Sequence, residues 1–289
     1  MKREFPVDAV GLGWRPELAA GILANLDRID VVEVIADDYF DASQKKRRAL
    51  GTLAAQVPVT LHGVSLGMAS CSRVDARRLD RMARLVNELR LETWSEHLAF
   101  VRAGGIEIGH LTATPRTEET IEATMRNLAI ATRIVGVAPQ MENIATLIDP
   151  PGSEMAEPVW LREIVRGSGC EMLLDLHNVH ANAVNFGLDA MKFLHVLPLE
   201  KVSAVHLAGG KWIGPAGRER LLDDHLHDVP DPVFALLEEV AARVIQPLTV
   251  ILERDGEYPE MEDLLLQLDR TRCALAKGRA RRVRLMPAA

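Results

Sequence analysis

Eight short segments rich in apolar and β-branched residues recur along the chain, and each is followed by a longer stretch with helical periodicity. The short segments are residues 7–12, 31–36, 57–61, 91–95, 137–141, 170–174, 202–205 and 248–252. The helical stretches are 16–26, 42–55, 73–89, 117–135, 157–168, 188–196, 231–243 and 260–276. Such alternation is typical of βα units around a parallel sheet. Eight units predict a closed (β/α)8 barrel, the TIM barrel, rather than an open sheet.

The size of the chain is compatible with one large barrel. It has 289 residues, of which 48% are apolar and 26% are charged, so disordered and fibrous classes are excluded. We find no linker or low-complexity segment, and we expect a single domain over residues 1–276. Two stretches, 176–185 and 206–231, are expected to be long loops at the end of the barrel where active sites lie.

The net charge of −7 is unevenly distributed. Residues 277–289 hold five basic side chains and no acid, whereas the rest of the chain holds 29 basic and 41 acidic ones, a net charge of −12. An acidic surface repels phosphates, so general nucleic-acid binding is not expected. We expect residues 277–289 to form a flexible basic tail, with contact to RNA or a partner as the alternative.

Targeting signals and disulfides are also not expected. No run of about 18 uncharged apolar residues is present, and residues 1–8 lack the apolar centre of a signal peptide. Cys71, Cys170 and Cys273 are too few and too scattered for a disulfide framework. We therefore expect a cytoplasmic protein with reduced cysteines and no membrane association.

Potential metal ligands lie at the ends of six consecutive predicted strands. Imidazole and carboxylate together suit iron, zinc or manganese. Because the carboxyl ends of all strands in a barrel meet at one rim, these side chains are expected to converge on one pocket. The strand-end residues are His62, Glu96-His97, Glu142-Asn143, Asp175-Leu-His177-Asn178, His206 and Glu253.

The number of potential ligands exceeds the needs of one tetrahedral zinc ion. The loop after the seventh strand adds Asp223, His225, His227 and Asp228, and the D-x-H spacing can place Asp223 and His225 on one ion. Two or three ions bridged by a carboxylate fit the ligand count better.

Acidic residues after the second strand allow two interpretations. Glu33, Asp37 and Asp38 could orient ligand imidazoles from outside, or they could form a solvated acidic loop. His110 and His195 lie away from the strand ends and are expected to be structural or solvent-facing.

Each strand-end residue also has a structural explanation when it is taken alone. A single strand-end histidine such as His62 or His206 is more often hydrogen-bonded than metal-bound. Asp175 could cap a helix, and Glu142 and Glu253 could pair with arginines. Their coincidence at six strand ends favours a metal site. Phosphate-cradling chemistry is not supported, because the GxGxxG and GxxxxGK[ST] motifs are absent from the sequence. Gly63-Val-Ser65-Leu-Gly67 has the GxSxG spacing, but Ser65 is expected to shape the loop after the third strand rather than to act as a nucleophile.

In this order, the motifs resemble those of the multinuclear non-heme iron-dependent oxidative enzymes over nearly the whole chain. The matching elements are Gly11-Leu-Gly13-Trp-Arg15-Pro16, Glu33-Val-Ile-Ala-Asp-Asp38, Leu61-His62-Gly63, Ser95-Glu96-His97, Pro115-Arg-Thr117, Glu142-Asn143, Leu174-Asp175-Leu-His-Asn178, His206-Leu-Ala-Gly209, Asp223-Asp-His225 and Glu253. His177 and His180 stand where many members have Asn and Tyr. They could enlarge the metal site or replace a substrate contact.

The resemblance implies a xylose isomerase-like TIM barrel that holds two or three irons, both Fe2+ and Fe3+, and uses O2 as co-substrate. The implied reaction modifies residues, often cysteines, of a ribosomally synthesised precursor peptide, with a partner protein that recognises the peptide's leader. The resemblance implies Glu142 as the bridging ligand and Glu142, Asp175 and His225 as catalytic residues. The implied ligands are His62, His97, Glu142, Asp175, His206, Asp223, His225 and Glu253, with Asn178 and His180 as weaker candidates.

Two other functions are left open by the sequence. A zinc- or manganese-dependent isomerase or hydrolase of the xylose isomerase-like type also gathers His, Asp and Glu at strand ends. A non-enzymatic metal-binding component of a maturation complex is the other alternative. The acidic composition disfavours an endonuclease, and long loops over the pocket disfavour a mere metal carrier.

Overall fold

Eight parallel strands close into a barrel in the computed structural model, which describes residues 8–103 and 106–285. The strands follow one another around the barrel in chain order, and the last pairs with the first. All eight predicted strands are strands of this barrel, so the predicted TIM barrel is confirmed. The strands are β1 (Ala9–Gly13), β2 (Val31–Ile35), β3 (Val59–Gly63), β4 (Trp94–His97), β7 (Pro139–Glu142), β8 (Met172–Asp175), β9 (Val202–Leu207) and β12 (Thr249–Leu252).

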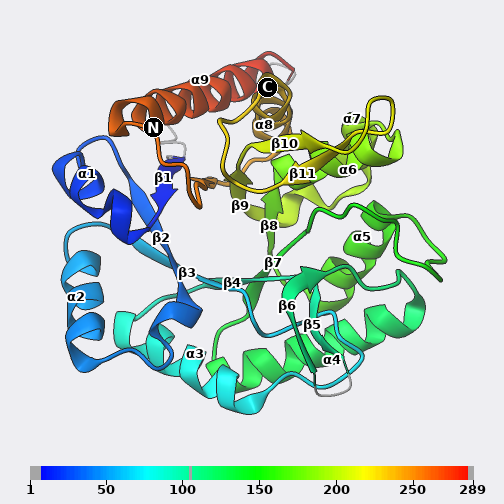
Figure 1. Ribbon diagram of the computed structural model, residues 1–289, viewed down its shortest axis with the longest axis horizontal. Helices are drawn as coiled ribbons and strands as arrows, with labels where there is room; N and C mark the ends of the chain where they lie inside the picture. The colour runs from blue at the N-terminus through cyan, green and yellow to red at the C-terminus, as the bar shows by residue number, and fades with distance from the viewer. Residues whose placement is uncertain (1–7, 104–105, 286–289) are drawn as a thin grey trace.

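The helices form a ring around the outside of the barrel (Figure 1). Each buries one apolar stripe, as α3 does with Leu79, Met82 and Val86. Local signals set several helix ends, since Thr117 caps the start of α4 and Gly136 ends it in a left-handed conformation. The helices are α1 (Ala19–Ala24), α2 (Gln44–Ala54), α3 (Ala76–Leu89), α4 (Glu118–Val135), α5 (Glu157–Ser168), α6 (Leu176–Phe186), α7 (Ala190–Val196), α8 (Asp231–Arg243) and α9 (Met261–Leu285), with short 3-10 turns η1 (Pro16–Leu18), η2 (Ala36–Tyr39) and η3 (Leu199–Lys201).

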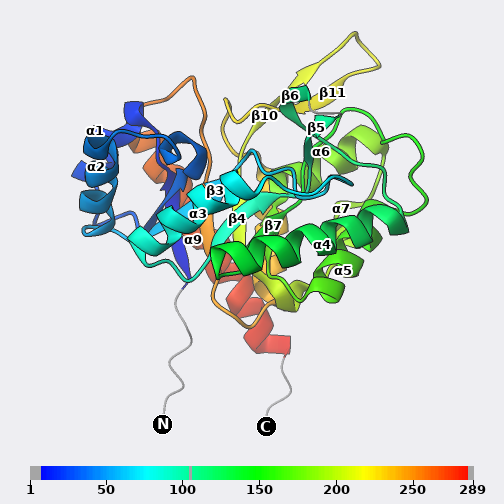
Figure 2. The ribbon, with the colours of Figure 1, turned by 90° about the horizontal axis from the view of Figure 1, so that it is seen from below.

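Two antiparallel hairpins follow β4 and β9 at the carboxyl end of the barrel. One consists of β5 (Phe100–Ala103) and β6 (Ile106–Thr112), and the other of β10 (Gly210–Ile213) and β11 (Arg220–Asp223). Both lie on the side of the barrel away from the described ends of the chain (Figure 2). The expected loop at 206–231 therefore contains a hairpin, and the pairing fixes its position.

The prediction of a loop at residues 176–185 is wrong, because these residues form α6. The carboxylate of Asp175 accepts a hydrogen bond from the backbone N–H of Asn178 and caps the first turn. Gly187 has a φ of +66° and ends the helix. The polar residues that resemble a loop in the sequence are buried residues of a helix.

The described part of the basic tail is helical rather than flexible, because α9 continues to Leu285. The Arg279 guanidinium bonds to the carboxylate of Asp8 and to the backbone carbonyls of Val244 and Gln246. These contacts attach the end of α9 to the barrel, so residue 277 is not a structural boundary. Residues 286–289 of the predicted tail lie outside the described residues.

The cysteines are unpaired, with Cys170 buried and Cys71 and Cys273 exposed. Within residues 8–103 and 106–285, no helix has both the length and the apolar character required to cross a bilayer.

Candidate metal centre

The carboxyl ends of six barrel strands bring six ionisable side chains together at one rim. His97 of β4 lies opposite Glu142 of β7, and Asp175 of β8 lies opposite His206 of β9. Residues in register on neighbouring parallel strands project from the same face of the sheet, so the two members of each pair lie side by side. All six side chains are buried: His62, His97, Glu142, Asp175, His206 and Glu253.

The first group joins β3, β4 and β7 and contains His62, His97 and Glu142. The Nε2 atoms of His62 and His97 lie 3.4 and 3.2 Å from Oε2 of Glu142. The Nδ1 atoms face away, His62 toward Ser95 Oγ at 2.8 Å and His97 toward the Gly63 carbonyl at 3.2 Å. These outer contacts orient both rings and leave Nε2 available for a cation.

The second group contains Glu142, Asp175, His206 and Glu253. Nδ1 of His206 lies 3.2 Å from Oε1 of Glu142 and 3.1 Å from Oε2 of Glu253. Among the described residues, Glu142 Oε2 and Asp175 Oδ2 are buried without a hydrogen-bond partner. Buried carboxylate oxygens are costly unless a cation or donor satisfies them, so this donor set fits a metal ion.

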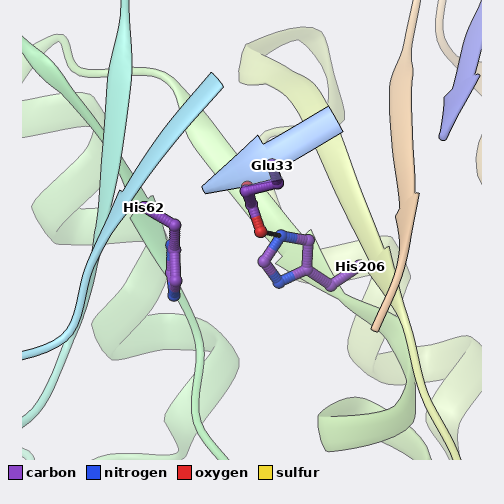
Figure 3. Close-up of side chains that lie close together, drawn as sticks. All are labelled: Glu33, His62 and His206. Carbon is purple, nitrogen blue, oxygen red and sulfur yellow. Dashed lines mark ion pairs between the residues drawn. The ribbon is translucent and has the colours of Figure 1, made fainter. Parts of the chain in front are cut away.

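Glu33 approaches His206 from the other side (Figure 3). Its Oε1 lies 2.9 Å from Nε2 of His206, although the ring N–H is poorly aligned with that oxygen. Glu33, His62 and His206 form a third possible group. The position of Glu33 matches the expected carboxylate that orients an imidazole, whereas Asp37 instead accepts a hydrogen bond from the Val64 backbone N–H.

Asp223 and His225 lie beside the second group. Nε2 of His225 is 3.0 Å from Oδ1 of Asp223, and its Nδ1 is 3.5 Å from Oε2 of Glu253. His225 has a φ of +55°, which is strained for a residue with a side chain and is typical of functional sites. Arg15 and Asp255 form an ion pair behind it, with Asp255 Oδ2 3.3 Å from His225 Nδ1. Sequence reasoning missed Asp255, which lies two residues beyond Glu253.

His177 supports this pair rather than joining a metal-binding group. Its Nδ1 lies 2.7 Å from Oδ1 of Asp223, and its ring is fully buried. Gly210 permits this burial, because a Cβ there would lie 2.7 Å from Cε1 of His177. His180 is half-buried and belongs to none of the three groups, with its ring centroid 6.3 Å from that of His177.

The remaining candidate ligands, Asn178, His227 and Asp228, differ in whether they already have other partners. Asn178 donates a hydrogen bond to the Asn143 carbonyl, and its Oδ1 is buried with no partner among the described residues. His227 instead contacts Asp224 at 3.0 Å, and Asp228 contacts Arg254 at 3.2 Å. Asn178 therefore remains a candidate ligand, whereas His227 and Asp228 have other partners.

A cavity of about 390 Å³ opens above the two groups. Its floor includes His97, Glu142 and His225. His110 is exposed on β6, as expected, and its side chain also lines this cavity. His195 lies on exposed α7 and contacts Arg243.

The crowding of charges changes the pKa values of the metal-free site. Burial opposes protonation of His97, but the carboxylates of Glu142 and Glu96 outweigh it and raise the pKa of His97 to about 9. The pKa of His206 is also raised, because Glu253, Glu33 and Glu142 together outweigh burial. Without metal, protons on the imidazoles balance part of the carboxylate charge.

Metal binding is therefore expected to release protons. At pH 7 His97 is protonated, and a metal ion binds only its neutral form. We expect roughly one proton or more to be released per Zn2+ bound, and an affinity that rises with pH up to about 9, the pKa of His97. Isothermal titration in buffers of different ionisation enthalpy measures this release. Identical binding heats in the different buffers would contradict the assigned protonation.

The contact between Glu33 and His206 gives a second prediction. Glu33→Ala removes the carboxylate that holds the ring, so we expect metal affinity to fall about tenfold, with a smaller loss in Glu33→Gln. Asp38→Ala, at an exposed acid nearby on η2, is the matched control. Competition with a chelator measures the affinity. Wild-type affinity in Glu33→Ala would contradict a positioning role, and loss of a whole ion would instead make Glu33 a ligand.

Comparisons with known proteins agree with this architecture. A family model described as "RiPP precursor modification enzyme MbnB/TglH/ChrH" matches residues 9–276. A UPF0276 protein of Streptomyces avermitilis is 38% identical over 283 residues, which is 94% of this chain and 56% of that protein. A UPF0276 protein of Caulobacter vibrioides is 33% identical over 275 residues, covering 95% of this chain and 96% of that protein. The chain thus spans just over half of the first relative and nearly all of the second.

Solved structures with low sequence identity share the fold alone. An L-ribulose 3-epimerase structure superposes with a TM-score of 0.60 at 13% identity, covering 97% of this chain and 99% of that one. A xylose isomerase domain protein from Planctomyces limnophilus gives a TM-score of 0.54 at 14% identity, with coverage of 97% and 99%. Because the family model spans the whole barrel, the chain belongs to the RiPP precursor modification enzyme family MbnB/TglH/ChrH, which confirms the resemblance of its strand-end motifs.

Proposed function

We propose that this protein is an iron-dependent oxidative enzyme that uses O2 to modify a residue, in particular a cysteine, of a ribosomally synthesised precursor peptide. The observation that carries the proposal is the position of Glu142. Its Oε2 faces His62 and His97, whereas its Oε1 faces His206. A carboxylate with its two oxygens directed at two donor groups has the arrangement of a bridge between two metal ions.

The donor set supports two ions and leaves room for a third. One ion would be held by His62, His97 and Glu142, and a second by the group that contains Asp175, His206 and Glu253. A third would be held by Asp223 and His225, with Asn178, which lines the same cavity, as a further candidate donor. Mixed imidazole and carboxylate donors suit iron in its ferrous and ferric states.

Bound iron supplies redox chemistry with dioxygen, which the side chains do not provide on their own. The chain contributes geometry and charge. Outer contacts from Ser95 and Gly63 fix two imidazoles, and burial keeps bulk water from the carboxylates.

We propose Glu142, Asp175 and His225 as catalytic residues. Glu142 joins the two groups, and the free Oδ2 of Asp175 faces the same space. His225 lines the cavity, where its ring would hold a metal ion next to the bound substrate. Burial and the nearby carboxylates of Asp223 and Glu142 raise the pKa of Asp175 in the metal-free site. A bound cation would favour its ionised form.

The peptide substrate is supported by the family description, which names modification of RiPP precursors. The motif resemblance supports cysteine as the residue modified and a partner protein that recognises the peptide leader. We place the reaction in the cytoplasm, where a ribosomal precursor is made.

One observation also fits another metal. The second group combines three carboxylates with one imidazole, a donor set that suits manganese as well as iron. A manganese- or zinc-dependent isomerase or hydrolase is therefore the competing function. It differs from the proposed one in having no redox change at the metal.

The bridging role of Glu142 is tested by its removal. Glu142→Ala takes a ligand from both groups, so we expect the protein to lose more than one iron per chain after anaerobic reconstitution. His195→Ala, at an exposed position on α7, should retain full iron content. Metal analysis measures both variants, with circular dichroism as the check on folding. Equal iron loss in the two variants, or loss of a single ion from Glu142→Ala, would rule out the bridge.

A further inference from the structure

The cavity above the metal centre has two chemically different surfaces. Its floor carries ionisable residues, including Glu142, Asp223 and His225, whereas its walls are largely apolar. The apolar wall residues are Leu111, Ile144, Leu147, Ile148, Leu221 and Leu222. Among the described residues that line it, none is lysine or arginine. The walls are therefore poorly suited to an acidic ligand and well suited to an apolar one.

Buried asparagines of α6 hold two of these walls in place. Asn182 accepts a hydrogen bond from the Thr146 N–H and donates one to the Ile144 carbonyl. Asn185 accepts from the Leu221 N–H and donates to the Leu221 carbonyl, as a neighbouring strand would. The loop after β7 and the strand β11 are thus both tied by hydrogen bonds to α6, whose N-cap is Asp175. These bonds hold two walls of the cavity in place.

Apolar side chains at the mouth of the cavity remain in contact with water. Leu147 is 37% exposed and Ile148 is 70% exposed, although both belong to the wall. An apolar ligand group placed against them would remove this surface from water, which is favourable. The occupant must also present its reacting group to the floor, so it is the substrate itself and not a separate partner.

We propose that this wall is a subsite for an apolar side chain adjacent in the peptide to the residue that is modified, and that Leu147 and Ile148 determine this specificity. The proposal rests on the proposed function, because it takes the peptide as the substrate. A volume of about 390 Å³ accommodates a reacting side chain together with one neighbour of leucine size. We assign the subsite to the residue next to the modified one because the wall and the floor belong to one cavity.

The test uses short probes with a single variable residue. N-acetyl-X-Cys-amide and N-acetyl-Cys-X-amide, with X as Leu, Gly or Asp, are added to the iron-loaded protein without oxygen, and in parallel to the metal-free protein. Saturation-transfer NMR measures binding without turnover. In the better of the two orientations, we expect the Leu probe to bind about tenfold more tightly than the Asp probe. Equal affinities, or no detectable binding of any probe, would overturn the subsite.

Substitutions at the mouth of the cavity test whether its apolar wall causes the preference for the Leu probe. Leu147→Asn and Ile148→Asn replace exposed apolar side chains by neutral polar ones, so the apolar contact is lost without a charge that would repel the Asp probe, and we expect each to bring the Leu and Asp probes close to equal affinity. Ile245→Asn is the matched control, since Ile245 is 68% exposed and precedes β12 at the opposite end of the barrel. An unchanged preference in both mouth variants would contradict the assignment. If the protein fails to hold iron but its metal-free form still prefers the Leu probe, the subsite is supported and the proposed function is refuted.

Discussion

The carboxylate of Glu142 contacts imidazoles from three different strands, and the arrangement of the site depends on it. Burying a charged carboxylate costs several kcal/mol unless cations or donors compensate for the lost hydration. Here the compensation comes from His62, His97 and His206, and burial is outweighed so that the pKa of Glu142 falls. These contacts require the observed strand register, because a shift of one residue would turn each side chain to the opposite face of the barrel.

The carboxylates and imidazoles at the rim and the apolar walls of the cavity form two chemically different surfaces. The floor concentrates negative charge that a cation would neutralise, which the raised pKa of His97 already indicates in the metal-free site. The walls are largely apolar, and the described residues that line the cavity include no lysine or arginine. Helix α6 links the two, since Asp175 caps it at the floor and Asn185 holds a wall.

The sequence was sufficient for the barrel and for most of the site. Buried parallel strands are short apolar runs, and their ends converge at one rim whatever the loops do. For this reason His62, His97, Glu142 and His206 could be placed from their positions alone. Helix α6 was missed because its inward-facing polar residues resemble a loop. Asn182 lies four residues after Asn178, and Asn185 lies three residues after Asn182. This spacing is typical of one face of a helix and could have predicted α6.

Other features depended on contacts between distant parts of the chain. The basic end of α9 reads as a solvated tail, yet Arg279 pairs with Asp8 at the far end of the sequence. His110 lines the cavity because the β5–β6 hairpin lies at the rim. Asp255 lies next to His225 and pairs with Arg15, which is far away in the sequence. Sequence spacing carries no information about such pairs.

Metal analysis combined with Mössbauer spectroscopy, on protein expressed with added iron and purified without oxygen, tests directly whether Glu142 bridges two irons. We expect two or three irons per chain, with at least two magnetically coupled through the Glu142 carboxylate when they are oxidised. Stoichiometric zinc or manganese with no coupled iron, after the same iron-supplemented expression, would contradict it.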